Sequence, residues 1–95
     1  MKVDLNITQA IDMWIQYGIH AGSCTELLLR GQYNEAFLHA HPNIKPHWQD
    51  HIKYIETCVP IECRNENYDS WQGKEKQQQE YEDLFTIWTV TLISY

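Results

Sequence analysis

With 95 residues, of which 43% are apolar and 21% charged, the chain is long enough for one packed domain and too apolar for wholesale disorder. Seven basic against thirteen acidic residues give a net charge of −6, which excludes a nonspecific nucleic-acid binder that works by neutralising phosphates. No apolar run approaches the roughly 18 residues that a membrane-spanning helix needs, and no leader with a cleavage site precedes the domain. We therefore expect one domain over residues 1–95, retained inside the cell, with neither a membrane nor nucleic acid as a direct partner.

The first predicted helix begins at Asn6 and reaches Gly18. Asn6 followed three positions later by Gln9 is a capping-box pattern, in which the two side chains bond the free amides of the first turn. Apolar residues behind this cap repeat at helical spacing and form one stripe: Ile7, Ile11, Trp14 and Ile15. The stripe predicts that one face of this helix is buried.

A second, shorter helix is predicted after the glycine corner at 18–22. Ser23 and Glu26 form another capping box, and three leucines follow it. Gly31 ends this helix, because glycine readily adopts the left-handed conformation that follows a helix end. The segment is short and apolar, so we expect it to be buried.

Two further helices are predicted between residues 33 and 60. The third carries apolar residues at the helical period and ends before Pro42. The fourth is capped by Asn43, accommodates Pro46 in its first turn and ends at Pro60. Its inner face consists of Ile44, Trp48, Ile52, Ile55 and either Val59 or Cys58.

The remaining chain is less regular. Residues 61–73 lose the apolar period and contain turn-forming side chains, so we expect a single short helical turn around Tyr68 and Trp71. Residues 84–95 are open to two interpretations: they continue a helical apolar stripe, but they are rich in β-branched residues, which prefer strands. A short strand that pairs with the alternating apolar residues near Val3 is the alternative to a helix.

These elements predict a mainly α fold, a compact bundle of four to five short helices with a C-terminal segment that is a helix or a short strand. The predicted core consists of Ile11, Trp14, Ile15, Leu28, Phe37, Trp48, Ile52, Ile55 and Leu84. A chain this small leaves little room for both a core and a preorganised active-site cleft, so we expect no enzyme.

Five histidines form the group most suggestive of metal chemistry. His47 and His51 are four residues apart on the fourth predicted helix, so both rings project from one face and could share a metal. The helical zinc-protease motif needs a glutamate directly after the first histidine, and Trp48 occupies that position. Histidine pairs at this spacing are mostly solvated surface. We therefore expect no metal or other cofactor, and a metal site at His47 and His51 remains an alternative.

The three cysteines, Cys24, Cys58 and Cys63, are an odd number, which argues against a disulfide framework and for a reducing compartment. Cys24 and Cys58 have apolar neighbours on predicted helices, where a free thiol packs as a small hydrophobe. Cys24 near a helix start, with His20 one corner away, comes closest to the pattern of a thiol nucleophile. A cysteine in a short buried helix is more often a packing residue, so we expect no catalytic residue.

Aromatic and acidic side chains carry the strongest functional signal. Trp14 and Trp48 belong to apolar stripes and are expected in the core, whereas Trp71 and Trp88 lie in less regular sequence and are candidates for a binding surface. Residues 62–83 contain seven acids and three bases, a local charge of −4, which forms either a solubilising face or a complement to a basic groove on a partner. The expected partner-binding residues are Glu62, Glu66, Asp69, Trp71, Glu80, Glu82, Asp83 and Trp88.

Spaced glycines and apolar positions across residues 14–71 resemble those of small accessory proteins encoded by tailed bacteriophages. The residues that carry the resemblance are Trp14, Ile15, Gly18, Ile19, Gly22, Ser23, Leu28, Leu29, Glu35, Ala36, Phe37, Ala40, Ile52, Tyr54, Pro60 and Trp71. The resemblance implies a helical phage protein in the host cytoplasm, and no catalytic residue comes with it. By analogy with other small acidic phage proteins, we expect a non-enzymatic inhibitor of a bacterial host or immune-system protein with a basic nucleic-acid groove, in the manner of an anti-defence or anti-CRISPR factor. A structural phage component that forms homo-oligomers, a homodimer in the simplest case, is the other alternative.

Overall fold

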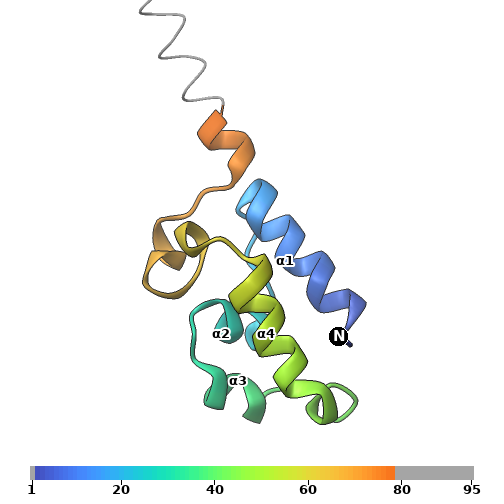
Figure 1. Cartoon of the computed structure of the whole chain (residues 1–95). Coiled ribbons are helices and arrows are strands. Elements are labelled where there is room, and N and C mark those ends of the chain that lie inside the picture. Colours follow the sequence, from blue (N-terminus) through green and yellow to red (C-terminus); the bar gives the residue numbers. More distant parts are fainter. Residues whose placement is uncertain (1, 79–95) are drawn as a thin grey trace, which may run out of the picture.

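The computed structural model describes residues 2–78, which form helices joined by short loops (Figure 1). In chain order the elements are α1 (Leu5–Tyr17), α2 (Ser23–Leu29), α3 (Tyr33–Leu38), the 3₁₀ helix η1 (Lys45–His47), α4 (Trp48–Cys58), and the 3₁₀ helices η2 (Ile61–Cys63) and η3 (Asn65–Ser70). Residues 74–78 are helical as well, and no residue between 2 and 78 belongs to a strand. The prediction of a mainly α fold is confirmed. The choice between helix and strand for residues 84–95 lies outside the described residues, as does the predicted core residue Leu84.

Asp4, and not Asn6, caps α1. The Asp4 carboxylate accepts a hydrogen bond from the Asn6 backbone N–H at 2.9 Å, and the Asp4 backbone is extended. The prediction of Asn6 as the cap is wrong, because Asp4 supplies a charged acceptor two residues earlier and Asn6 becomes part of the first turn. At the other end, where the predicted glycine corner begins, Gly18 follows α1 with a left-handed φ of +69°.

The two short helices α2 and α3 lie side by side (Figure 1). Ser23 was expected to cap α2 and is instead its first helical residue, because the extended backbone of Gly22 (φ −66°, ψ 167°) leads directly into the helix. The chain leaves α2 through Gly31, whose φ is +81°, as predicted. The Cys24 thiol donates to the carbonyl oxygen of Ala36 at 3.4 Å and so connects the two helices.

The fourth predicted helix is divided in two. Pro46 lies in η1, and α4 follows with His47, not Asn43, at its N-terminal boundary. Pro46 has no backbone N–H to donate, which a first helical turn tolerates, and the chain makes this short 3₁₀ turn before α4 begins. The helix ends ahead of Pro60, as predicted.

The apolar core draws on each helical segment from α1 to η3 except η1, which has no buried residue. Five predicted core residues are buried: Ile11, Trp14, Leu28, Trp48 and Ile55. Two more, Ile15 and Ile52, are partly buried against them. The prediction for Phe37 is wrong: 38% of its surface is exposed, because its ring lies at the rim of the core, edge to face with Trp48 at a centroid distance of 5.4 Å and beneath the Lys45 ammonium at 5.0 Å.

The structure also corrects two expectations near the end of α4. Residues 61–70 were expected to hold a single helical turn, but they form η2 and η3 and bury Cys63 and Tyr68 completely. Cys58 was expected among apolar neighbours and is exposed, because the helix ends there and Val59 occupies the inner position. Between residues 2 and 78, no helix combines the length and the apolar character that crossing a membrane requires.

Candidate functional site

The residues predicted to bind a partner fall into two groups. The first group lies in the described part of the chain: Glu62, Glu66, Asp69 and Trp71. The second group lies outside the described residues: Glu80, Glu82, Asp83 and Trp88. The three acids of the first group are exposed on η2 and η3, and we call residues 61–70 the acidic segment.

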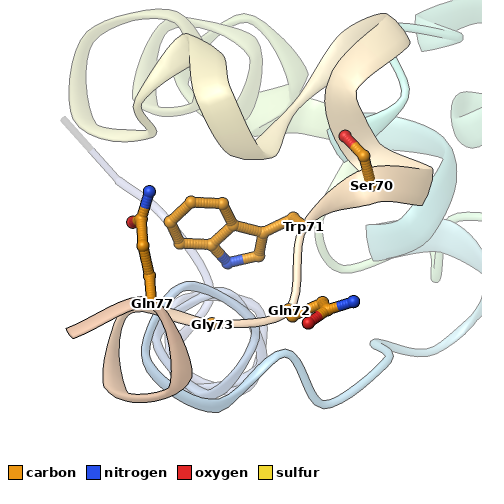
Figure 2. A pocket seen from close by; sticks show the side chains of 5 residues that line it. All are labelled: Ser70, Trp71, Gln72, Gly73 and Gln77. Carbon is orange, nitrogen blue, oxygen red and sulfur yellow. The ribbon is translucent and has the colours of Figure 1, made fainter. Parts of the chain in front are cut away.

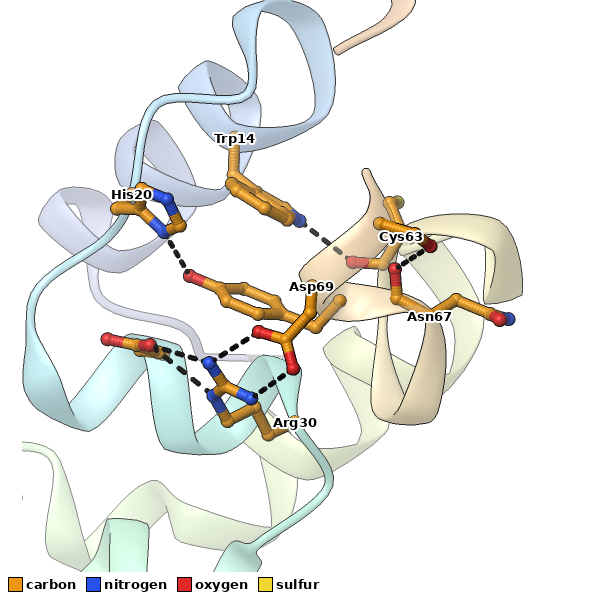
Figure 3. Close-up of polar contacts among 9 residues, drawn as sticks. Trp14, His20, Arg30, Cys63, Asn67 and Asp69 are labelled. Atoms are coloured by element: carbon orange, nitrogen blue, oxygen red, sulfur yellow. Dashed lines mark hydrogen bonds and ion pairs between the residues drawn. The ribbon is translucent and has the colours of Figure 1, made fainter. Parts of the chain in front are cut away.

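Aromatic stacking and a buried hydrogen bond hold the acidic segment against α1 (Figure 3). The Tyr68 ring stacks on Trp14 with 4.1 Å between the ring centroids and 17° between the planes. The Trp14 indole N–H donates to the carbonyl oxygen of Cys63 at 2.8 Å. All three residues are buried, so the core holds the acidic segment at the Tyr68 ring and at the Cys63 carbonyl group.

Arg30, the residue directly after α2, binds the C-terminal end of the acidic segment through Asp69 (Figure 3). Its guanidinium donates to both carboxylate oxygens of Asp69, at 2.8 and 3.2 Å, and to Glu26 at 3.1 and 3.3 Å. The guanidinium carbon also lies 4.5 Å from the centroid of the Tyr68 ring, within the range of a cation–π contact. The hydrogen bonds to Asp69 and Glu26 raise the pKa of Arg30, and Arg30 in turn lowers the pKa of Asp69. The exposed carboxylate of Asp69 is therefore already paired with Arg30.

Hydrogen bonds between side chains and backbone close the acidic segment on itself. Arg64 donates from Nε to the carbonyl oxygen of Val59 at 2.9 Å. Asn67 donates from its side-chain amide to the carbonyl oxygen of Ile61 at 3.0 Å, which joins η3 to η2. With these bonds the segment has a defined conformation as well as a fixed position.

Within residues 2–78, Glu62 and Glu66 differ from Asp69 in having no ion-pair partner. Both salt bridges found within residues 2–78 belong to Arg30. Next to Glu62, the side chain of Ile61 is 49% exposed. The acidic segment thus presents two carboxylates without an ion pair in the described part of the chain, beside an apolar side chain, a mixture that suits a protein interface.

Trp71 is half-buried and anchored to the fold. Its indole N–H is shared between the carbonyl oxygens of Trp14 (3.0 Å) and Ile15 (3.2 Å) near the end of α1. The ring borders a cavity of about 150 Å³ whose other walls are Ser70, Gln72, Gly73 and Gln77 (Figure 2). A partner could reach the Trp71 ring through this cavity.

Cys24 and His20 have separate partners. The thiol of Cys24 donates to a backbone oxygen, whereas Nδ1 of His20 lies 3.2 Å from the hydroxyl of Tyr68. Burial raises the pKa of both Cys24 and Cys63. This is opposite to the direction that produces a nucleophilic thiolate, so these thiols act as packing groups and hydrogen-bond donors.

His51 is buried, with 1% of its surface exposed, and both of its ring nitrogens lie within hydrogen-bond distance of backbone groups. The expectation of a solvated histidine pair is therefore wrong for His51, which the first residues of the chain cover. Within residues 2–78, no group of three or more His, Cys, Asp or Glu side chains is placed to hold a metal ion.

Comparison with protein-family models, with curated proteins and with solved structures gives no match for this chain. The resemblance to phage accessory proteins therefore rests on the sequence pattern of residues 14–71.

Proposed function

We propose that this chain binds a basic surface of a bacterial protein through the acidic segment and inhibits that protein by covering the surface. The observation that carries the proposal is the exposure of Glu62 and Glu66, free of either ion pair found within residues 2–78, on a backbone that the core holds in place. A surface rich in Lys and Arg is the complement of these carboxylates and of a chain with a net charge of −6.

Preorganisation is the physical advantage of the acidic segment over a flexible acidic loop. A flexible loop loses conformational freedom on binding, at a cost of about 0.5–1.5 kcal/mol for each long side chain that is immobilised. The stacking of Tyr68 on Trp14 and the bond from Trp14 to Cys63 fix this backbone before any partner arrives. Binding therefore orders little more than the glutamate side chains.

A nucleic-acid-binding protein is the partner whose chemistry fits best, because a groove that binds phosphates is lined with Lys and Arg. An acidic protein docked in such a groove competes with the nucleic acid for the same positive charges. Together with the resemblance to phage proteins, this favours a bacterial polymerase, nuclease or immune complex as the target, and an anti-defence role of the anti-CRISPR kind.

Affinity purification with charge variants tests the proposal. The wild-type chain and a Glu62→Lys/Glu66→Lys variant are immobilised and exposed to bacterial lysate. Asp69 is left unchanged because its ion pair supports the fold. The matched control is Asp12→Lys/Glu35→Lys, which alters the net charge equally at exposed positions of α1 and α3.

We expect a bacterial protein that the wild type and the control retain, that nucleic acid displaces, and that the Glu62→Lys/Glu66→Lys variant fails to retain. Equal retention by all three chains contradicts the proposal, and so does recovery of no protein above the level of blank resin.

A further inference from the structure

Residues 2–4, which precede α1, are attached to α4 by two hydrogen bonds. The backbone N–H of Asp4 donates to Nε2 of His51 at 3.1 Å, across 47 positions of sequence. The backbone N–H of Lys2 donates to the carboxylate of Asp50, also at 3.1 Å. We call residues 2–4 the N-terminal strap.

The two nitrogens of the His51 ring have opposite roles. Nδ1 lies 2.7 Å from the carbonyl oxygen of His47, which can only accept, so Nδ1 carries the proton. Nε2 faces the N–H of Asp4, which can only donate, so Nε2 carries none. The geometry thus fits the neutral Nδ1–H tautomer, with both ring nitrogens paired in a site that is 1% exposed.

We propose that His51 is a pH-sensitive latch that holds the N-terminal strap on α4 when neutral and releases it when protonated. A proton on Nε2 converts the acceptor of the Asp4 N–H into a second donor, so two donors then face one another at 3.1 Å. A buried imidazolium also needs a negative partner in place of a backbone amide. The strap therefore leaves α4 as His51 gains its proton. This latch is independent of the acidic segment.

The titratable groups around His51 come from the strap, from η1 and from α4. Lys2, Asp4 and His47 line a cavity of about 170 Å³ beside the ring, and the Asp50 carboxylate is bonded to the Lys2 N–H. The Asp4 carboxylate is engaged as the cap of α1. The Asp50 carboxylate loses its Lys2 partner once the strap moves.

Release of the strap also affects α1, because Asp4 takes part in both structures. Its backbone N–H is held by His51, while its carboxylate accepts from the first amides of α1. When the backbone of Asp4 is no longer fixed, the cap loses its orientation and the first turn of α1 loosens. Protonation of one histidine on α4 is thereby transmitted to another helix.

Nitrogen NMR of the full chain tests the latch directly. The pH is lowered stepwise from about 7.5 until the chain begins to unfold, while the ring nitrogens of His51 and the hydrogen-exchange protection of the Asp4 amide are followed. We expect an unprotonated Nε2 at the higher pH, and a fall in Asp4 protection of about tenfold with the same midpoint as His51 protonation. Protection that survives protonation of His51 overturns the proposal, as does a ring whose Nε2 carries the proton at the higher pH, and so does a ring that stays neutral until the chain unfolds.

Variants separate the latch from general effects of acid. The side-chain oxygen of His51→Gln can accept from the Asp4 N–H but does not titrate, so Asp4 protection in this variant should not change over the same range. His41→Gln removes an exposed histidine and should behave as the wild type. A folded His51→Gln variant that still loses Asp4 protection in acid contradicts the latch. If that variant does not fold, the wild-type titration alone decides.

Discussion

The indole N–H of Trp71 lies 3.0 Å from the backbone oxygen of Trp14, a residue 57 positions earlier in the chain. The Trp14 carbonyl oxygen also accepts from the backbone N–H of Gly18 at 2.9 Å, so Trp71 adds a second donor there and bonds the neighbouring Ile15 carbonyl near the end of α1. The same Trp14 donates its own indole N–H to Cys63. The acidic segment is therefore fastened to α1 at both of its ends, and this attachment fixes the direction in which its carboxylates point.

Replacement of Trp71 by Phe tests this attachment. The variant keeps most of the aromatic surface but loses the N–H, so its free energy of unfolding should fall by about 1–2 kcal/mol. Trp71→Ala also loses the ring and should cost about 3 kcal/mol. Urea denaturation measures both values. A Trp71→Phe variant as stable as the wild type would show that the indole N–H contributes nothing to the fold.

Gly18 and Gly73 allow two backbone segments to touch. A Cβ at Gly18 would lie 2.6 Å from the Gln72 carbonyl group, and one at Gly73 would lie 2.6 Å from the carbonyl carbon of Tyr17. Both glycines also have positive φ, +69° and +100°. Gly73→Ala should therefore cost more than about 2 kcal/mol in the free energy of unfolding.

Gly22→Ala is the control for this substitution, because a Cβ there meets no atom within 4 Å. It should cost about 1 kcal/mol or less, the usual penalty for alanine at a helix cap. Thermal denaturation compares the two variants, and equal losses would contradict the close contact between Gly18 and Gly73.

The helical framework follows largely from local sequence rules, whereas several helix starts do not. The glycine ends of α1 and α2 and the stop before Pro60 depend on residues adjacent in sequence. Asp4 and Asn6 are both good caps, and a contact that local rules cannot supply favours Asp4: its backbone N–H bonds His51 in α4.

The candidate site shows the same division. The exposure of Glu62 and Glu66 follows from their charge and their place in a turn-rich stretch. The pairing of Asp69 with Arg30 joins residues 39 positions apart, so no local sequence pattern predicts it. Tyr68 was not recognised as a core residue, because a 3₁₀ helix of six residues has too few turns to show an apolar period.

The ion pair between Arg30 and Asp69 makes stability depend on pH in acid. Arg30 lowers the pKa of Asp69 in the folded chain, and unfolding returns it to the ordinary value near 4. The contribution of the ion pair to the free energy of unfolding is therefore complete above about pH 5 and is lost as the pH falls through the lowered pKa of Asp69. Asp69→Asn should be less stable than the wild type at neutral pH and close to it at about pH 2.

Chemical denaturation at the two pH values measures the difference in stability between Asp69→Asn and the wild type. Glu66→Gln, which removes an exposed acid without an ion pair in the described chain, should show no comparable effect. A stability difference for Asp69→Asn that stays constant from neutral to acid pH would rule out the ion pair as its cause.

Thiol labelling should distinguish the three cysteines. Cys58 is exposed, Cys24 is half-buried and Cys63 is buried, and burial raises the pKa of the latter two. In the native chain Cys58 should react first with a thiol reagent, and Cys63 about tenfold more slowly or less. Mass spectrometry of partly labelled protein gives the order, and the unfolded chain, where all three should react alike, is the control. Equal native rates for Cys63 and Cys58 would contradict the burial of Cys63.

The association rate with the partner recovered by affinity purification is the most direct measure of whether Glu62 and Glu66 steer this chain to a basic surface. At low salt, Glu62→Lys/Glu66→Lys should associate about tenfold more slowly than the wild type and lose most of the salt dependence, while Asp12→Lys/Glu35→Lys should follow the wild type. Equal rates for the wild type and Glu62→Lys/Glu66→Lys at low ionic strength would contradict recognition through the acidic segment.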